Sequence, residues 1–190
     1  MTQADSAVAD DDKKQGFEDV GSFHLDETEI EWLYEQQEEC TVCWTTKEGF
    51  PVGMPHLYVW ADGSFWVTTS GQRKRVQALR NRPQSCIVIS SKATAHGSGD
   101  MVSVKTLATI HEDRDRLRWF LPLFLDRAHY PKEHHEEQFK LFFTPRRLVI
   151  EFKPVNVLSF SSHKLGAAMI ASGQSEEALK ANKPSTHFGD

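Results

Sequence analysis

Three consecutive basic residues, Arg73, Lys74 and Arg75, stand where a strand-like segment changes into a helix-like one. The first backbone N–H groups of a helix are unpaired and partially positive, so cations in this turn are on the unfavourable side of the helix dipole. A bound phosphate would remove the conflict, because it accepts hydrogen bonds from the N–H groups and from the basic side chains. Three hydroxyl side chains just upstream add further donors: Thr68, Thr69 and Ser70.

A second interpretation of the same turn is a solvated loop on a module that binds another protein and no cofactor. Each cation then costs at most about 0.3–1 kcal/mol through the dipole, which surface helices tolerate. Neither a GxxxxGK[ST] loop nor a GxGxxG turn is present to strengthen the phosphate interpretation. The charge pattern alone supports the two interpretations equally.

Composition narrows the classes of function. The chain has 190 residues and a formal net charge of -5, which fits a single domain and gives no electrostatic case for nucleic acid. No apolar run approaches the roughly 20 residues of a membrane span, and the acidic N-terminus does not resemble a signal peptide. Three cysteines are too few for a disulfide framework. We therefore expect a cytoplasmic protein that binds neither nucleic acid nor membrane.

The order of strand and helix patterns predicts an α+β, mainly β domain. Residues 1–21 are acidic and poor in large apolar side chains, which is typical of a disordered tail. Residues 166–190 are predicted to form a second, partly disordered tail. Residues 22–165 between them show six antiparallel strand patterns with short flanking helices. The expected architecture is a small antiparallel barrel of about six strands.

Two prolines mark expected interruptions. Pro122 lies inside a helical pattern around Trp119, and Pro154 lies inside a strand pattern near the end of the domain. Because proline lacks a backbone N–H, we expect a kinked or divided helix at the first and two separate strands at the second. The helix around Trp119 is too apolar for a free surface, which predicts a contact with the core or with a second subunit.

The segment DGSFWVTTSGQRKRVQALRNRPQSCIVIS, Asp62 to Ser90, resembles the signature of the pyridoxamine-phosphate-oxidase-like, FMN-binding split-barrel superfamily, which includes deazaflavin-dependent reductases. The segment and the family signature share the same order of features. An Asp-Gly hairpin leads into a strand ending in Thr, which is followed by a basic turn, a helix with Leu, a Pro and another apolar strand. KEGFPVGMPHLYVW resembles the preceding family strand, and VSVKTLATIHED and RRLVIEFKPVNVLSF resemble the closing strands. The resemblance covers about residues 27 to 160.

This resemblance implies a six-stranded antiparallel split β-barrel. It also implies a non-covalent cofactor, FMN or the deazaflavin coenzyme F420, held by a homodimer with the cofactor site at its interface. By the resemblance, Lys74 and Arg75 hold the cofactor phosphate, and Arg73 takes the place of the family's serine. Thr68 and Thr69 would line the ring or the phosphate. The backbone of one strand would flank the ring: Met54, Pro55, His56 and Leu57.

Departures from the family pattern argue against pyridoxamine phosphate oxidation itself. The strand at residues 53–58 lacks the further Arg and Lys of those oxidases, and the chain ends in THFGD rather than Arg-Leu-Ala-Pro. Thr106 also replaces a glycine of the family strand. The resemblance thus implies an oxidoreductase that transfers hydride to or from another small organic substrate. The alternative is a carrier or sensor that binds flavin or haem without turnover.

Histidines and cysteines give weaker indications. Among the histidines, we consider only His56 for substrate contact or proton transfer. The alternative is that its hydrogen bonds are satisfied within the fold and that it has no functional role. The CxxC pair, Cys40 and Cys43, lies at a helix-to-strand boundary without a second pair, which favours core cysteines over a redox or zinc site. No metal is expected at a histidine-rich segment that lacks metal-site spacing: His129, His134 and His135.

Overall fold

The structure, a computed structural model, describes residues 20–177. Its helices are η1 (Val20–Ser22), α2 (Glu27–Gln36), α3 (Lys74–Asn81), α4 (Arg114–Arg127), η2 (Lys132–His134), α5 (His135–Phe142) and α6 (Ser162–Ala171). Its strands are β1 (Glu39–Thr45), β2 (Pro51–Leu57), β3 (Val59–Ala61), β4 (Ser64–Ser70), β5 (Gln84–Ser90), β6 (Asp100–His111) and β7 (Arg147–Ser161).

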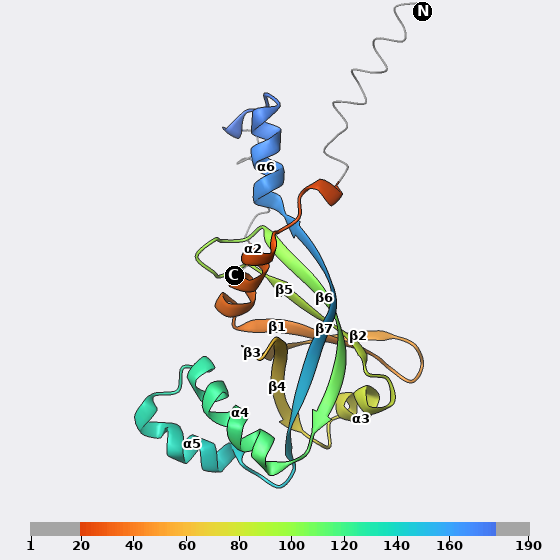
Figure 1. Ribbon diagram of the computed structural model, residues 1–190, viewed down its shortest axis with the longest axis vertical. Coiled ribbons are helices and arrows are strands. Elements are labelled where there is room, and N and C mark those ends of the chain that lie inside the picture. Colours follow the sequence, from red (N-terminus) through yellow and green to blue (C-terminus); the bar gives the residue numbers. More distant parts are fainter. Residues whose placement is uncertain (1–19, 178–190) are drawn as a thin grey trace, which may run out of the picture.

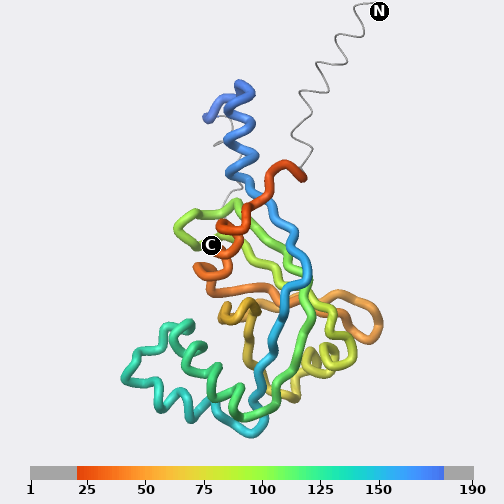
Figure 2. The backbone as a smooth tube through the Cα atoms, viewed as in Figure 1, coloured from red at the N-terminus to blue at the C-terminus, as the bar shows by residue number. Residues whose placement is uncertain are grey.

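All strands belong to one antiparallel sheet that curls into a half-open barrel (Figure 1). The strand order is β2-β1-β5-β6-β7-β4-β3, so the two edges are formed by strands that are close in sequence. The tube in Figure 2 shows β6 and β7 running along the length of the sheet, with α4 and α5 beside one end and α2 and α6 beside the other. The predicted α+β split barrel is confirmed.

The sheet has seven strands rather than the six expected, because the chain turns inward at Tyr58. The backbone N–H of Tyr58 donates to the Glu38 carbonyl at 3.2 Å, and its hydroxyl donates to the Tyr34 carbonyl at 2.8 Å. β2 consequently pairs with β1, whereas β3 pairs with β4 at the opposite edge. The β3–β4 turn is the predicted Asp-Gly turn, in which Asp62 and Gly63 both have positive φ.

β7 is one strand of 15 residues where two were expected. Lys105 on β6 pairs with Asn156, but the next residue, Thr106, pairs with Pro154. Val155 is therefore the extra residue of a β-bulge. A bulge disrupts the ladder locally, so the missing N–H of Pro154 is tolerated and the strand continues.

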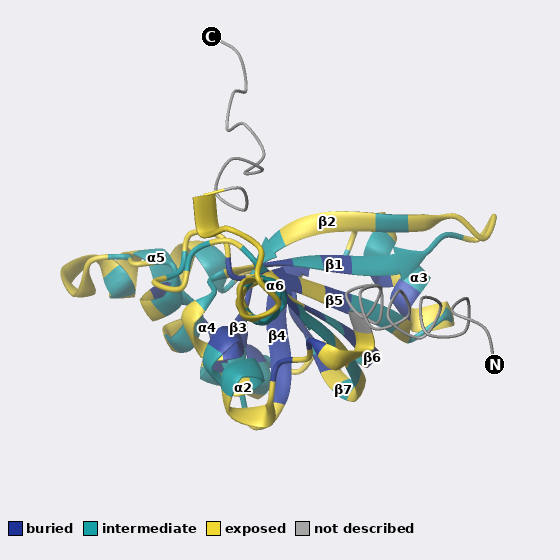
Figure 3. Ribbon diagram, turned by 90° about the horizontal axis from the view of Figure 1, so that it is seen from above, coloured by how far each residue is buried: buried dark blue, intermediate teal, exposed yellow. Residues whose placement is uncertain are grey.

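Buried apolar residues form two cores on opposite faces of the sheet, whereas β2 is mostly exposed (Figure 3). The main core fills the barrel interior and includes residues of α2, α3 and most strands: Leu33, Tyr34, Phe65, Val76, Ile87, Val104 and Phe152. The second core lies where α4 packs on the outer face of β3, β4 and β7: Val59, Trp66, Leu117, Phe120, Leu121 and Val149. The helix around Trp119 is thus a core contact within the chain, and Pro122 does not divide it.

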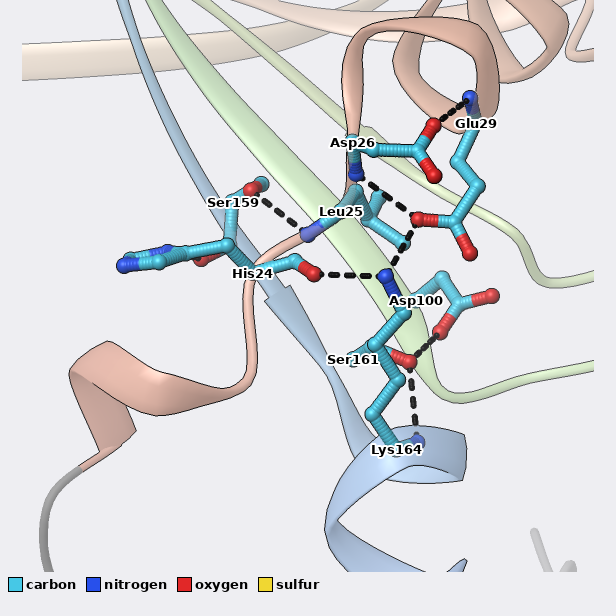
Figure 4. Close-up of polar contacts among 8 residues, drawn as sticks. All are labelled: His24, Leu25, Asp26, Glu29, Asp100, Ser159, Ser161 and Lys164. Atoms are coloured by element: carbon cyan, nitrogen blue, oxygen red, sulfur yellow. Dashed lines mark hydrogen bonds and ion pairs between the residues drawn. The ribbon is translucent and has the colours of Figure 1, made fainter.

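A polar network holds α2 and α6 over the same end of the sheet (Figure 4). The Ser161 hydroxyl donates to the buried Asp100 carboxylate at 2.6 Å and caps α6 by accepting from the Lys164 backbone N–H. The Lys164 ammonium donates to the His24 carbonyl at 2.8 Å and to the Glu29 carboxylate at 2.5 Å. Glu29 also belongs to the capping box of α2, so one residue serves both helices.

The predicted tails fall mostly on residues 1–19 and 178–190, which lie outside the described residues. η1 covers the end of the first predicted tail, and α6 crosses the predicted boundary between residues 165 and 166. Within residues 20–177, no helix combines the length and the apolar character that crossing a membrane requires.

Phe120 tests how much the α4 layer contributes to stability. Its ring is fully buried, so Phe120→Ala should lower the free energy of unfolding by about 3–5 kcal/mol through lost burial and the cavity left behind. Phe50→Ala, where the ring is 70% exposed, is the control and should change it by less than about 0.5 kcal/mol. Urea unfolding followed by tryptophan fluorescence measures both. Equal effects in the two variants would contradict this packing.

Candidate functional site

The basic turn predicted to bind an anion does lie at the N-terminus of a helix. Between β4 and α3, the Gly71 N–H donates to the Arg146 carbonyl at 2.8 Å, and a Cβ at Gly71 would lie 3.3 Å from Leu148 Cδ2. The N-cap residue of α3 is Arg73, whose side chain makes no capping hydrogen bond. The turn therefore lacks the side-chain acceptor that usually satisfies the first N–H groups of a helix.

Arg75 turns inward from the first turn of α3. Its Nη2 donates to the Thr69 hydroxyl at 2.8 Å, and Thr69 is only 3% exposed. The Nε atom of Arg75 is buried and has no hydrogen-bond partner among the described residues. Burial, and secondly the charge of Arg73, lowers the pKa of Arg75. Since buried donors normally have acceptors, Arg75 retains a donor for a ligand or a water molecule.

His56 on β2 lies close enough to Arg75 to feel its charge. Burial, and secondly the charge of Arg75, lowers the pKa of His56 to about 4, so the imidazole is neutral at pH 7. Its Nε2 is buried without a partner in the described chain. His56 is opposite Cys40 in the β1–β2 register, and Cys40 faces the main core. Two unsatisfied buried polar atoms thus lie on the interior side of the sheet.

Lys74 borders a different space from Arg75. It lines a hollow of about 470 Å³ between α3 and the β1–β2 hairpin, together with Trp44 and Arg82. Glu48 borders the same hollow, and its pKa is lowered chiefly by hydrogen bonds from backbone and hydroxyl groups, with help from the charges of Arg82 and Lys74. Small-molecule sites begin at about 300 Å³, so the hollow is of suitable size.

Arg147 adds to the positive charge and was missed by the sequence analysis. It is opposite Ser70 in the β4–β7 register, and its pKa is lowered by burial and then by the charge of Arg73. None of the ion pairs found among the described residues involves Arg73, Lys74, Arg75 or Arg147. In the sequence, the pair Arg146-Arg147 at the start of the closing strand was the signal that could have identified Arg147.

The other predicted residues of β2 leave one side of the site open. Met54 is 46% exposed, Pro55 is exposed, and Leu57 is half-buried. Met54 is opposite Val42, which faces the main core, so Met54 shares the interior face of β2 with His56. The strand can therefore present an apolar side chain and an imidazole to the same ligand.

The predicted residues of β4 separate onto two faces. Thr69 faces the interior and contacts Arg75, whereas Thr68 faces the other side of the sheet, and its hydroxyl donates to the Leu148 carbonyl at 2.9 Å. The Ser70 carbonyl accepts from the Arg73 N–H at 3.1 Å, which shapes the turn. The structure thus groups Thr69, Arg75 and His56 and places Thr68 apart from them.

No three His, Cys, Asp or Glu side chains gather into a possible metal site within residues 20–177. The histidine-rich segment has separate partners instead, since His129 pairs with Glu38, His134 with Glu137, and His135 with the Tyr130 carbonyl. The absence of a metal stays a prediction. Of the CxxC pair, Cys40 is a core residue as expected, but Cys43 is only half-buried.

Comparison with known proteins gives fold matches only. No family model and no curated protein matches the chain. A conserved hypothetical protein from Mycobacterium tuberculosis is similar over 88% of this chain and 94% of its own, at 18% identity and a TM-score of 0.66. An F420 reductase is similar over 67% of this chain and 94% of its own, at 16% identity and a TM-score of 0.54. The heme storage protein HutZ of Vibrio cholerae is similar over 71% of this chain and 93% of its own, at 14% identity and a TM-score of 0.55.

These structures resemble this chain in fold. The fold is that of the pyridoxamine 5′-phosphate oxidase-like split barrels. At identities below 20% the likeness concerns the fold alone. What this split barrel binds must therefore be argued from its own residues.

His56 makes the stability of this split barrel depend on pH. Its pKa is about 4 in the folded chain, against about 6.5 in an unfolded one. The unfolded state therefore binds the proton more tightly, so the stabilisation is complete above about pH 6.5 and is lost as the pH falls through about 4. His56→Gln should make the free energy of unfolding less dependent on pH between these values, as measured by urea unfolding. An NMR titration of the His56 ring near pH 6.5 would contradict its burial.

Proposed function

We propose that this split barrel binds a flavin-type cofactor, FMN or coenzyme F420, through its phosphate at the start of α3. The observation that carries the proposal is Arg75, a half-buried cation with a buried Nε that has no acceptor in the described chain. A phosphate oxygen would satisfy this donor and compensate the charge in a single contact.

The residues around the turn offer several donors to a phosphate. The Arg73 side chain does not cap α3, and of the first N–H groups that of Val76 donates to the Arg73 carbonyl at 2.9 Å, so those of Lys74 and Arg75 would serve an anion. Thr69 holds the Arg75 guanidinium in place. Lys74 borders the separate hollow beside α3, and its exposed side chain would turn from there toward the same phosphate. The tricyclic ring would extend along β2, where Met54 supplies apolar surface.

The cofactor would supply the hydride chemistry, as flavins do. The chain's part is to fix the phosphate with Arg75 and Lys74, to shield the ring with β2, and to orient a substrate. Because His56 is neutral at pH 7, its unsatisfied Nε2 can donate or accept one hydrogen bond to a substrate, according to the tautomer. We therefore propose an oxidoreductase that transfers hydride to or from a small organic substrate other than pyridoxamine phosphate.

A homodimer with the site at its interface is part of the proposal. It rests on the family resemblance and on the open side of the site, where Met54 is 46% exposed and Pro55 is also exposed. A flavin ring lying on β2 would keep one face in water unless a second copy covered it. The net charge of -5 and the scarcity of cysteine keep a cytoplasmic protein without nucleic-acid or membrane partners as our expectation.

A carrier or sensor that binds flavin or haem without turnover is the second candidate. It is favoured by His56, since a neutral imidazole with a free nitrogen is the usual axial ligand of haem iron. Tight binding of haem or flavin together with no turnover of any tested acceptor would support this candidate over the enzyme.

Cofactor titration of the purified full chain is the direct test. FMN, coenzyme F420 and haem are titrated separately into cofactor-free protein, and fluorescence or absorbance is followed. We expect one of the two flavin-type cofactors to bind. Lys74→Ala and Arg75→Ala should each weaken binding by about 10- to 150-fold, because each charge-assisted hydrogen bond contributes about 1.5–3 kcal/mol.

Arg80→Ala is the matched control for both variants. Arg80 lies on the same helix but pairs with Glu112, so its removal should leave cofactor affinity within about twofold of the unaltered protein. Circular dichroism checks that all variants are folded. Folded protein that binds neither FMN nor coenzyme F420 would exclude the proposal, and equal losses in all three variants would remove the phosphate contact from α3.

The dimer is tested separately by sedimentation, with and without the cofactor. We expect a dimer whose dissociation on dilution is accompanied by loss of cofactor, because the second copy covers the ring. A monomer that binds the cofactor with full affinity would contradict this part of the proposal.

A further inference from the structure

Two cysteines face each other across β1 and β5. Cys43 and Cys86 are Cα partners in the antiparallel register of these strands. Directly opposed residues of such a ladder have Cα atoms about 4.5–5.5 Å apart, which lies within the range of about 4.4–6.8 Å spanned by disulfides. Both residues carry free thiols, and neither is fully buried.

The neighbours of the pair in the same row favour a reaction between the thiols. Gly53 on β2 is the partner of Cys43. A Cβ there would lie 3.0 Å from Thr41 Cγ2 and 3.4 Å from the Cys43 sulfur, so the glycine leaves room that a side chain would take. Lys105 on β6 is the partner of Cys86. The exposed Lys105 side chain places a positive charge on this face of the sheet, which attracts an anionic disulfide.

The pair lies on the face of the sheet that points away from the main core. Cys40, three residues before Cys43, points to the other face and is 2% exposed. Val88, two residues after Cys86 on the same face, is 37% exposed. A small solute in water can therefore approach Cys43 and Cys86 but not Cys40.

We propose that Cys43 and Cys86 form a reversible cross-strand disulfide when the protein meets a low-molecular-weight disulfide such as oxidised glutathione. In the reduced chain, the Cys86 sulfur lies 3.2 Å from the Ser103 hydroxyl, and the Cys43 sulfur lies 4.0 Å from the Thr41 carbonyl. Both side chains rotate about their Cα–Cβ bonds to meet, while the strands keep their register.

The reaction proceeds by two thiol–disulfide exchanges. One cysteine thiolate attacks a sulfur of oxidised glutathione and expels a glutathione thiolate, and the second cysteine then attacks the mixed disulfide and expels the other. Two protein thiols lose two protons and two electrons, and one oxidised glutathione becomes two reduced molecules. Burial, and secondly the charge of Cys86, raises the pKa of Cys43, which lowers the share of its thiol present as the reactive thiolate.

The full chain is equilibrated in buffers with increasing ratios of oxidised to reduced glutathione, then quenched with acid and alkylated under denaturing conditions. Mass spectrometry counts the protected thiols, and peptide mapping identifies the bond. We expect two thiols to become protected together, a cross-linked peptide containing Cys43 and Cys86, and return to the reduced form with dithiothreitol. Cys40→Ala should behave in the same way, whereas Cys43→Ser and Cys86→Ser should lose the cross-link.

Three outcomes would overturn the proposal: all thiols alkylated at every ratio, glutathione adducts without a cross-link, or a bond between two chains. The disulfide is measured at equilibrium, so the result does not depend on how slowly glutathione reaches the cysteines if a second copy covers this face. The peptide map of the unaltered protein decides the result even if a variant fails to fold. No cofactor is needed, so failure here leaves the proposed function untouched.

Discussion

The pairing of β6 with β7 is the constraint on which the rest of the structure depends. It runs from Asp100 opposite Ser161 to His111 opposite Val149, the longest ladder of the sheet. β6 also pairs with β5, and β7 also pairs with β4, so these two strands join the halves of the barrel. One end of the ladder carries the network that holds α2 and α6. The other end brings the start of β7 beside the basic turn before α3.

The bulge after Lys105 reconciles this ladder with its sequence. Pro154 cannot donate a ladder hydrogen bond, and an uninterrupted register would place it in the middle of a paired strand. At the same position β6 carries Thr106, which is buried and whose hydroxyl lies 2.8 Å from that of Ser85. The polar side chain that replaces the family's glycine therefore has a partner, and the backbone irregularity is absorbed by β7.

The basic turn shows a local conflict that the fold does not resolve by itself. Arg75 and Arg147 are both partly buried, their pKa values are both lowered in part by the charge of Arg73, and no carboxylate of the described chain pairs with them. Uncompensated charges and unsatisfied donors cost stability and are concentrated at functional sites. An anion that binds the folded chain and not the unfolded one would recover part of this cost.

The sequence by itself determined the elements whose causes are local. Asp26 caps α2, and Asp62 with Gly63 forms the β3–β4 turn, because capping and turn formation depend on neighbouring residues. The basic turn at the start of α3 was predictable for the same reason. Tertiary structure alone decided that Arg75 contacts Thr69 while Lys74 borders a separate hollow.

Register between distant strands also lay beyond the sequence. It set Arg147 beside the basic turn and Cys43 opposite Cys86, more than 40 residues apart in the chain. It also allowed Pro154 to stay within a continuous strand instead of dividing it. Alternation along one strand shows which residues share a face, but the face of the neighbouring strand that meets them follows from the packing of the whole barrel.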